Sequence, residues 1–526
     1  MKTVTYKKTG YFSKTAIDYL SQNEQIKEYY DLYPTKENIK KQIEEKSKTK
    51  SNRKVLVEVL TKQYKKKQTS KKTAQNIQQL LQENTYTITT GHQLNLFTGP
   101  LYFLYKIITT INLCEELKAD NPEQNFVPIY WMATEDHDFE EIQYFNIRNE
   151  KIIWDRKSTG AVGRLKTKSL ETVLEKLTKQ FGTSQNGKRL LKLFKDSYLK
   201  NDTLSEATRY ITNELFKEYG LVIIDADNSK LKREFIPIAK EELQNQTAYK
   251  EVTKTNKTFG KNYKIQVKPR KINLFYLTNK IRERILLENE TYKINNTKIR
   301  FTKEEIQTEL QKHPERFSPN VIMRPLYQEV ILPNLAYIGG GGEIAYWLEL
   351  KTYFKKNNVT FPILLLRNSA LIISEKQEKK IKKLKISKQE IFLKQHELIT
   401  KKITEITNLN LDFSKLKEQL EKQFSEMRTI AAKTDKSFIG AVNAQEKKQL
   451  KGLKNLEKRL LKAEKRKLNH IVKRITEIQN QLFPKQSLQE RHTNFSEMYL
   501  EYGEQLIPKL KENLKPLDLK FSVVTL

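Results

Sequence analysis

The sequence predicts an α/β protein whose core is an open parallel sheet, with two insertions and a long helical segment. Three observations predict it. Residues 85–141 follow a strand–loop–helix–strand order, four apolar runs end in polar residues, and glycine and proline become rare over residues 375–485. Buried strands that alternate with helices are typical of parallel sheets. Lys- and Glu-rich stretches with spaced apolar residues are typical of paired helices.

The first α/β unit contains the clearest pattern. Residues 85–90 are rich in Thr and Ile, which favours a strand. A glycine-containing loop follows, and Pro100 suits the first turn of a helix that extends to about Leu117. Residues 126–132 are continuously apolar, as expected of a strand buried on both faces. This unit therefore predicts two neighbouring parallel strands joined by a helix.

The rest of the chain divides by composition. Residues 1–84 are expected to form a helical layer on the sheet, GLVIIDAD and ILLLRNS give further strands, and FSVVTL gives a final strand that packs on the core. The predicted divisions are 1–150 (core, first part), 151–219 (a mainly helical insertion), 220–234 (core strand), 235–318 (an α+β insertion), 319–374 (core, with a glycine-rich loop and the last strands), 375–487 (helical coiled coil) and 488–526 (return to the core).

Local patterns predict detail within the second insertion and the helical segment. Residues 263–268 and 273–278 resemble strands, and residues 291–301 resemble a hairpin around Asn295-Asn296. A long helix is predicted over about 375–406. Apolar seams at 413–431 and 468–482, with Gly440 between them, predict an antiparallel helical pair.

Composition limits the class of protein. The formal net charge is +34, but the lysines are spread along the chain and no zinc-finger spacing or RNA-binding block accompanies them, so we expect no nucleic-acid partner. Cys114 is the single cysteine and lies on a predicted apolar helix face, so we expect a buried core residue. No run reaches the ~18–20 apolar residues that span a bilayer, and the N-terminus lacks an apolar signal core. We expect a cytoplasmic protein without a membrane partner.

Polar residues follow four of the predicted strands, in the sequences TGHQ, ATEDHD, DAD and LRNS. In an open parallel sheet, ligands bind at the carboxyl ends of the strands. The pattern predicts one cleft there, formed by His92, Glu135, Asp136, His137, Asp138, Asp225, Arg367 and Ser369.

Two of these segments allow alternative interpretations. The loop 91–100 lacks the Walker A ending, yet it can direct backbone N–H groups at an anion, or it can be a structural turn. Its candidate ligand contacts are Gln93, Asn95, Thr98 and Gly99. The EDHD cluster can act as acid or base, bind an amine or hold a metal, while Asp138 and Glu141 also fit a helix capping box.

The glycine run Gly339–Gly342 is the other candidate loop, because it lets backbone approach a ligand closely. Gly340, Gly341 and the following Glu343 are candidate ligand contacts, and a flexible turn is the alternative explanation of the glycines. Arg324 and Arg367 are candidate clamps for carboxylate or phosphate. Tyr337 can shape the pocket or belong to the core.

Several long blocks together resemble a known family. They are TGHQLNLFTGPLYFLYK, PIYWMATEDHDFEEI, GLVIIDAD, QVKPRKINLFYL, SPNVIMRPLYQEVILPNLAYIGGGGEIAYWLEL, FPILLLRNSALI and LQERHTNFSEMYLEYG, in this order over nearly the whole chain. This pattern is similar to the cysteine-adding enzymes of bacillithiol biosynthesis, also described as cysteine ligases of the BshC family. The resemblance implies a Rossmann-like core with two connecting-peptide-type insertions and a coiled-coil domain that mediates homodimer contacts. It implies amide formation between cysteine and the glucosamine nitrogen of glucosaminyl-malate, the last step of bacillithiol synthesis.

Roles follow from the implied substrates. Arg324, Arg367 and the loop N–H groups would bind the malyl carboxylates, His137 or Asp138 would be the base, and Glu135 would bind the ammonium of cysteine. His92 lies where nucleotidyltransferases and class I aminoacyl-tRNA synthetases carry His-x-Gly-His, but the pattern is incomplete, and LRNSA replaces a KMSKS loop. ATP or another nucleotide is therefore possible without a signature that secures it. No residue is assigned to a metal, and a metal requirement stays open.

Two other functions are compatible with parts of the sequence. One is a metal-dependent hydrolase of a phosphorylated or sugar substrate, built on the EDHD cluster. The other is a basic coiled-coil protein that binds nucleic acid. Neither explains the resemblance over several blocks.

Overall fold

The structure is a computed structural model that describes residues 2–64, 69–434 and 436–526. The chain forms two compact units. Met1–Ile372 and Leu488–Val524 belong to the larger unit, and Ile373–Ser487 form the smaller one. Among the described residues, no helix combines the length and apolar character needed to cross a membrane.

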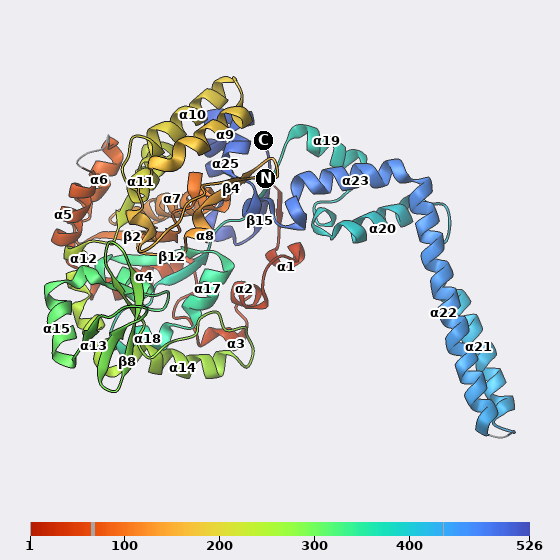
Figure 1. The fold of residues 1–526 in the computed structure, drawn as a ribbon. Helices are drawn as coiled ribbons and strands as arrows, with labels where there is room; N and C mark the ends of the chain where they lie inside the picture. Colours follow the sequence, from red (N-terminus) through yellow and green to blue (C-terminus); the bar gives the residue numbers. More distant parts are fainter. Residues whose placement is uncertain (1, 65–68, 435) are drawn as a thin grey trace. The chain divides into compact units, whose positions relative to one another are not determined.

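The core of the larger unit is a five-stranded parallel sheet with the spatial order β13-β12-β2-β3-β6 (Figure 1). Its strands are β2 (Thr85–His92), β3 (Asn125–Met132), β6 (Val222–Asp225), β12 (Asn334–Gly339) and β13 (Ile363–Leu366). His92 pairs with Met132, and Met132 with Asp225, so the carboxyl ends of three strands meet at one edge. The predicted parallel core is confirmed.

Strand β12 is the strand of the core sheet that the sequence pattern does not predict. Its residues are buried at all six positions, and it lies between β13 and β2. The glycine run that follows favours a loop, and the apolar stretch before it is short. Pairing with two neighbouring strands therefore makes a strand of a segment whose local sequence is ambiguous.

Helices cover the sheet. Helix α7 (Tyr102–Asp120) packs on β2 and β3, α4 (Lys36–Ser47) on β12, and α5 (Arg53–Tyr64) and α6 (Lys71–Gln79) on β6. Cys114 on α7 is buried in the core, as expected. Further helices of this unit are α1 (Tyr6–Thr9), α2 (Lys14–Leu20), α3 (Glu24–Lys27), α16 (Met323–Ile331), α17 (Gly341–Leu348), α18 (Lys351–Lys356), α24 (Gln489–His492), α25 (Phe495–Tyr502) and α26 (Leu506–Asn513).

A small second sheet joins the two ends of the chain. Strand β15 (Phe521–Thr525) lies between β1 (Lys2–Val4) and β14 (Ala370–Ile373), and it pairs antiparallel with β1. The final strand is confirmed. Strand β1 is not predicted, because the polar N-terminal sequence favours helix throughout.

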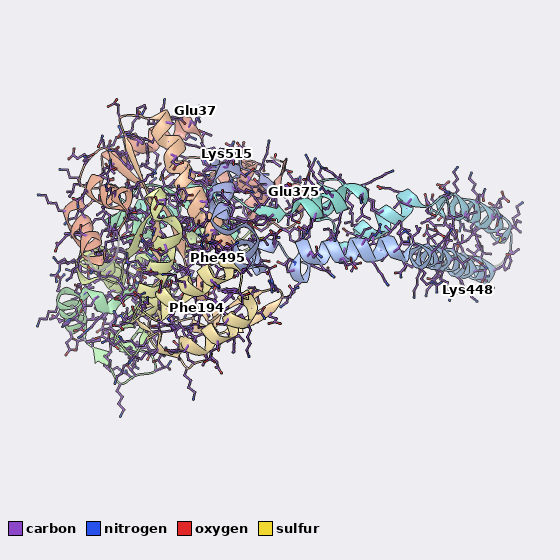
Figure 2. All side chains as sticks on the ribbon, turned by 90° about the horizontal axis from the view of Figure 1, so that it is seen from above. Glu37, Phe194, Glu375, Lys448, Phe495 and Lys515 are labelled. Atoms are coloured by element: carbon purple, nitrogen blue, oxygen red, sulfur yellow. The ribbon has the colours of Figure 1, made fainter. Side chains whose placement is uncertain are left out.

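Helix α8 (Phe139–Ile142) and the unpredicted hairpin of β4 (Tyr144–Ile147) and β5 (Glu150–Ile153) close the first part of the core, and the insertion predicted over 151–219 starts within β5. It continues as α9 (Glu171–Phe181), α10 (Gln185–Tyr198) and α11 (Leu204–Phe216), so its predicted helical character is confirmed. Phe97 of the core packs against Phe194 and Phe495, which are labelled in Figure 2. This aromatic cluster joins the insertion, the loop after β2 and the C-terminal segment.

The second insertion combines helices with an antiparallel sheet of order β10-β9-β8-β7-β11. Helix α12 (Ser229–Glu234) precedes this insertion. The helices of the insertion are α13 (Ile236–Asn245), α14 (Thr247–Phe259) and α15 (Lys303–Lys312), and its strands are β7 (Leu274–Leu277), β8 (Arg282–Glu288), β9 (Thr291–Ile294), β10 (Arg300–Phe301) and β11 (Phe317–Pro319). The hairpin around Asn295-Asn296 is confirmed. The strand predicted over 263–268 is wrong: the Glu349 carboxylate accepts the backbone N–H groups of Gln266 and Val267 in place of a neighbouring strand.

The smaller unit is helical, with α19 (Glu375–Lys383), α20 (Gln395–Ile406), α21 (Ser414–Ala431), α22 (Lys436–Lys467) and α23 (Asn469–Leu482). Helix α21 pairs with α22, and α23 with α20. The predicted pairing of the two seams is therefore wrong, and Gly440 lies inside α22. Phe424 and Ala431 of the first seam form an apolar cluster with Val442 of α22. The first seam therefore packs against α22 and not against the second seam. The single helix predicted over 375–406 is interrupted where Lys385 adopts a positive φ of 51°.

Candidate active site

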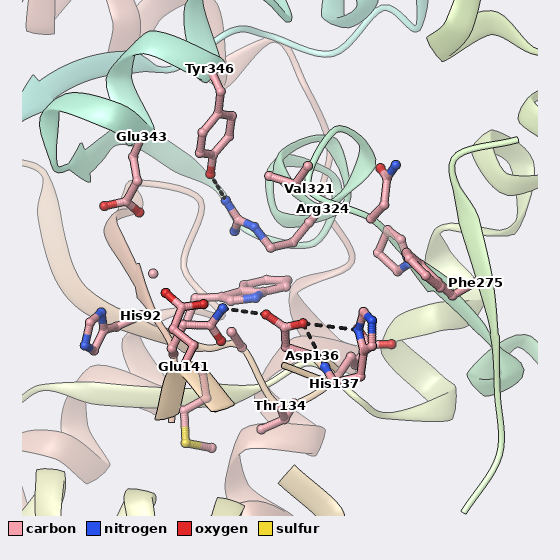
Figure 3. A pocket seen from close by; sticks show the side chains of 18 of the residues that line it. His92, Thr134, Asp136, His137, Glu141, Phe275, Val321, Arg324, Glu343 and Tyr346 are labelled. Carbon is pink, nitrogen blue, oxygen red and sulfur yellow. Dashed lines mark hydrogen bonds and ion pairs between the residues drawn. The ribbon is translucent and has the colours of Figure 1, made fainter. Parts of the chain in front are cut away.

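A cavity of about 580 Å³, lined by both charged and apolar side chains, lies at the carboxyl ends of β2 and β3 (Figure 3). Its walls come from both strand ends, from α7, α16 and α17, and from the second insertion. It is lined by Gly91, His92, Gln93, Tyr102, Lys106, Trp131, Met132, Ala133, Thr134, Glu135, Asp136, His137, Glu141, Lys268, Arg270, Phe275, Arg282, Pro319, Asn320, Val321, Arg324, Tyr337, Glu343 and Tyr346. The predicted location at this edge of the sheet agrees with the cavity.

Asp136 is one of three carboxylates from the segment after β3 that line the cavity, together with Glu135 and Glu141. Its carboxylate accepts hydrogen bonds from the Gln93 side chain and from the backbone N–H of His137, and Arg282 lies 3.7 Å away. Burial raises the pKa of Asp136, but the contacts with His137, Arg282 and Gln93 outweigh it and hold this pKa well below its usual range. Asp136 is therefore an ionised group that orients its neighbours.

His137 is half-exposed, and its Nδ1 lies 2.7 Å from Nη1 of Arg282. A guanidinium group only donates, so Nδ1 must accept this hydrogen bond. With Nδ1 as the acceptor, the ring N–H is the one at Nε2. In this arrangement His137 offers an N–H donor, and its basic nitrogen is occupied by Arg282.

Glu141 provides the carboxylate that is best placed to take up a proton. It lines the cavity, and burial together with the nearby Asp136 and Asp138 carboxylates raises its pKa. The Asp138 side chain accepts the Glu141 backbone N–H at 3.2 Å, which is one half of the predicted capping box. The cap holds Asp138 outside the cavity lining and leaves the Glu141 carboxyl group at it.

Glu135 lines the cavity but forms an ion pair with Lys232. Burial raises the pKa of Glu135 although Lys232 lowers it. The Lys232 ammonium also donates to the backbone oxygen of Phe317, 2.8 Å away. This pair therefore ties the loop after β3 to the second insertion.

The inner end of the cavity is formed by Lys106 and Glu343. The Lys106 ammonium lies 2.6 Å from the backbone oxygen of Gly91 and 2.5 Å from the Glu343 carboxylate. Glu343 also accepts from the Tyr337 hydroxyl at 2.7 Å and from the Gly340 N–H at 2.8 Å. Lys106 was not predicted. A lysine inside the apolar run LYFLYKII is the sequence signal that could have identified it.

The basic wall is formed by α16 and the second insertion. Arg324 of α16 donates through Nη2 to the Tyr346 hydroxyl at 3.0 Å and through Nη1 to Gln328 at 3.1 Å. Lys268, Arg270 and Arg282 line the same cavity. These three residues were missed because their segment looks like a separate domain in the sequence.

His92 lines the cavity as a buried, neutral ring. Burial lowers its pKa well below the usual range, and the nearby Lys106 and Arg367 charges lower it further. The ring packs edge-on against Tyr102, 5.4 Å between centroids, and its Nε2 has no hydrogen-bond partner. It is suited to a hydrogen bond with a ligand.

The structure does not bring Arg367 and Ser369 into the cavity lining. Arg367 forms a buried ion pair with Glu490, 2.7 Å from Nη2 to Oε1, and its Nη1 donates to the Ser369 hydroxyl at 2.9 Å. The clamp expected at Arg367 is thus replaced by a contact with the C-terminal segment. Asp225 likewise bonds to Thr134 behind the lining.

The predicted contacts in the two loops divide between cavity and scaffold. Gln93, Tyr337 and Glu343 line the cavity. Asn494 donates to the backbone oxygens of Phe97 and Gly99 at 2.8 and 2.6 Å, so this loop is held from the C-terminal segment. The predicted contacts that lie outside the lining are Asn95, Thr98, Gly99, Gly340 and Gly341.

The cavity lining combines basic and acidic side chains, with Arg282 only 3.7 Å from Asp136, which suits a small ligand carrying both carboxylates and an amine. Over the described residues, no group of three or more His, Cys, Asp or Glu side chains could hold a metal ion. The glycine-rich loop does not fit a nucleotide phosphate as it stands, because the Glu343 carboxylate occupies the Gly340 N–H. Fold and cavity define a Rossmann-like α/β protein with a charged small-molecule site.

The comparisons identify the family. Residues 1–368 match the family model "Bacillithiol biosynthesis BshC, N-terminal Rossmann-like domain", and residues 370–526 match "Bacillithiol biosynthesis BshC, C-terminal coiled-coil domain". The chain belongs to this BshC family, as the sequence blocks predicted.

Three similar proteins carry the name "Putative cysteine ligase BshC". The one from Flavobacterium johnsoniae is 56% identical, with 99% of each chain covered. Those from Flavobacterium psychrophilum and Christiangramia forsetii are 57% and 56% identical, with 99% of this chain and 98% of theirs covered. A solved chain from Campylobacter jejuni, whose title names an arginyl-tRNA synthetase, covers 84% of this chain and 96% of its own at 9% identity and a TM-score of 0.20, a likeness that supports no conclusion.

Proposed function

We propose that this protein is a cysteine ligase of bacillithiol biosynthesis, which joins the carboxyl group of L-cysteine to the glucosamine amine of glucosaminyl-malate. Membership of the BshC family supports this function. The observation that supports it in the structure is the cavity, whose lining combines arginine and lysine side chains with carboxylates such as Glu141.

The malyl group is assigned to the basic wall. Arg324 has its guanidinium fixed by two hydrogen bonds, and each of its terminal nitrogens carries a second N–H group. A guanidinium matches a carboxylate through two parallel hydrogen bonds. Lys268, Arg270 and Arg282 supply the charge for a second carboxylate.

The reacting amine is assigned to Glu141. As the new C–N bond forms, the amine nitrogen must lose one proton, and the Glu141 carboxylate takes it. The raised pKa of Glu141 brings this group closer to neutrality, where a general base is most effective. Asp136 stays ionised and faces the ammonium of cysteine, while Nε2–H of His137 donates to the substrate.

The carboxyl group of cysteine requires activation, because amide formation from a free acid is uphill in water. ATP or another nucleoside triphosphate is the co-substrate we propose. No residue is assigned to the nucleotide. The Glu343 carboxylate already accepts the Gly340 N–H, the group in the glycine-rich loop that a phosphate would otherwise bind. Activation is therefore tested separately from the amine and carboxylate contacts.

The setting of the reaction follows from the same family. We propose a cytoplasmic homodimer assembled through the coiled coil, with small molecules as its only substrates and no nucleic-acid partner. Size-exclusion chromatography with light scattering on the full chain, and on a chain lacking residues 414–467, tests the assembly. If the shortened chain still has the mass of a dimer, assembly through the coiled coil is contradicted.

The activity test incubates purified protein with cysteine and glucosaminyl-malate, with and without ATP, and detects the thiol product by mass spectrometry. Product that depends on ATP, with stoichiometric AMP or ADP, is the expected result. Arg324→Met should abolish turnover at low glucosaminyl-malate, whereas replacement of an exposed arginine of β8, Arg284→Met, should not. Absence of product with ATP and every other nucleoside triphosphate would contradict the proposal.

A further inference from the structure

Arg324 is the cavity end of a buried chain of polar side chains. Arg324 and Gln328 lie four residues apart on α16, so their side chains share one face of the helix. Nη1 of Arg324 donates to Oε1 of Gln328 at 3.1 Å, and the Gln328 amide donates through Nε2 to Oε1 of Glu329 at 2.9 Å. Gln328 is fully buried and does not line the cavity.

The far end of this chain is anchored on the core sheet and on α4. Oε1 of Glu329 also accepts from the Asn334 amide at 2.7 Å. Oδ1 of Asn334 accepts from the hydroxyls of Thr87 and Thr89 on β2, at 3.2 and 2.8 Å. Lys46 of α4 places its ammonium 3.7 Å from Oε2 of Glu329. Glu329 and Asn334 are 3% and 0% exposed, so water does not compete for these bonds.

The anchor fixes the orientation of the Gln328 amide. Its nitrogen must face the Glu329 carboxylate, because a carboxylate oxygen accepts hydrogen bonds, and its oxygen must then face Arg324. Arg324 is held on its other side by the Tyr346 hydroxyl at 3.0 Å. The rings of Tyr337 and Trp131 lie 5.6 and 6.0 Å from the guanidinium carbon. Figure 3 shows the guanidinium bonded to Tyr346 and turned into the cavity.

We propose that Gln328 is a positioning residue of the active site, which acts through Arg324 to set affinity for the carboxylate end of the substrate. The identity of that substrate rests on the proposed function, but the contact does not. Two hydrogen bonds in different directions fix the plane of the guanidinium, whereas Tyr346 alone leaves it free to rotate. Loss of the Gln328 bond therefore weakens recognition of carboxylates and raises KM, with little effect on kcat at saturation.

The test measures binding of L-malate, a dicarboxylate probe, by isothermal titration calorimetry. Gln328→Met keeps length and helix propensity but removes both hydrogen bonds. Hydrogen bonds to charged groups contribute about ten- to hundredfold in binding, so Gln328→Met should weaken L-malate at least about tenfold. The matched control is Gln42→Met, a buried glutamine whose amide donates to the Phe361 backbone oxygen at 3.0 Å, away from the cavity. Its malate affinity should not change.

A double-variant cycle separates positioning from a general loss of structure. Arg324→Met should also weaken L-malate, and adding Gln328→Met to it should cost nothing further, because Gln328 acts only through Arg324. If Gln328→Met does not fold, Gln328→Asn keeps the amide but shortens it by one methylene, and the same cycle applies. Steady-state assays of the single variants should show the change in KM and not in kcat.

Each outcome has one meaning. Additive losses of Gln328→Met and Arg324→Met, or wild-type affinity in Gln328→Met, would overturn the positioning role. Loss of affinity in Gln42→Met to the same degree would also overturn it. If the wild type forms product yet Arg324→Met binds L-malate as well as the wild type does, Arg324 is not the carboxylate contact and the inference fails while the proposed function stands. If malate binding follows the cycle but no thiol product forms, the positioning role of Gln328 stands and the proposed function fails.

Discussion

The ion pair between Arg367 and Glu490 gives a sharp test of the site's boundary. Its side chains are 3% and 0% exposed, and the Glu490 carboxylate also accepts the backbone N–H of Ala370 at 3.1 Å. Glu490→Gln keeps the shape and one acceptor but leaves the arginine charge buried without a counter-charge. Removal of one partner from a buried pair typically costs about 3–5 kcal/mol of stability.

The assay is thermal unfolding of the full chain, followed by circular dichroism and calorimetry. Because the unfolding entropy grows with size, we expect the melting temperature of the larger unit to fall by about 3–6 °C. The double variant Arg367→Met with Glu490→Leu should lose less than the sum of the single variants, because both charges leave together. At a temperature where the variants are folded, the KM of Glu490→Gln for glucosaminyl-malate should be that of the wild type.

A refuting result is equally clear. An unchanged melting temperature in Glu490→Gln, together with a large rise in KM for glucosaminyl-malate, would mean that Arg367 contacts substrate. The prediction that Arg367 binds a substrate carboxylate would then be correct, and the buried Arg367–Glu490 pair would form only in the absence of substrate.

Three further predictions follow from the same contacts. Glu141→Gln should lower kcat by about 10²–10⁴-fold, as loss of a general base does, while His137→Gln should cost less; single-turnover assays compare them. Burial, together with the Asp227 carboxylate, raises the pKa of Asp225 to about 6, so its stabilising contribution is complete below the unfolded pKa near 3.8 and is lost as the pH rises through 6. Denaturant titrations at pH 5 and 8 should therefore show a smaller pH dependence in Asp225→Asn, and an unchanged one would contradict the assignment. Asn494→Leu leaves the Phe97 and Gly99 oxygens without their donor and should destabilise the protein by about 1–3 kcal/mol, whereas Asn513→Leu, whose amide bonds only within its own helix, should not.

The core was predictable because local signals and tertiary structure agree there. Strands β2, β3, β6 and β13 are apolar runs that end in polar residues. The pattern predicted one cleft at all four ends; residues at the ends of β2 and β3 line the cavity, whereas Asp225 and Arg367 do not. Strand β12 was missed because glycines follow a short apolar run, and only its neighbours on both sides reveal it as a strand.

The site was predictable in part for a similar reason. Five predicted residues at or just after the ends of β2 and β3 line the cavity: His92, Gln93, Glu135, Asp136 and His137. Arg367 follows a strand too, but its partner Glu490 lies far along the chain, and sequence does not show such a pairing. The basic residues of the second insertion were invisible for the opposite reason, since they reach the cavity only through the fold of that insertion.

The order of the chain has a consequence for synthesis of the protein. The larger unit is completed by residues that follow the helical unit, since β15, Glu490 and Asn494 all lie after Ser487. Ribosomes add about 5–20 residues per second, so roughly 115 residues of the helical unit delay these partners by about 6–23 s. During this interval the nascent core exposes the buried charge of Arg367 and an unpaired β14. We therefore expect chaperones to be needed more for folding during translation than for refolding of the complete chain.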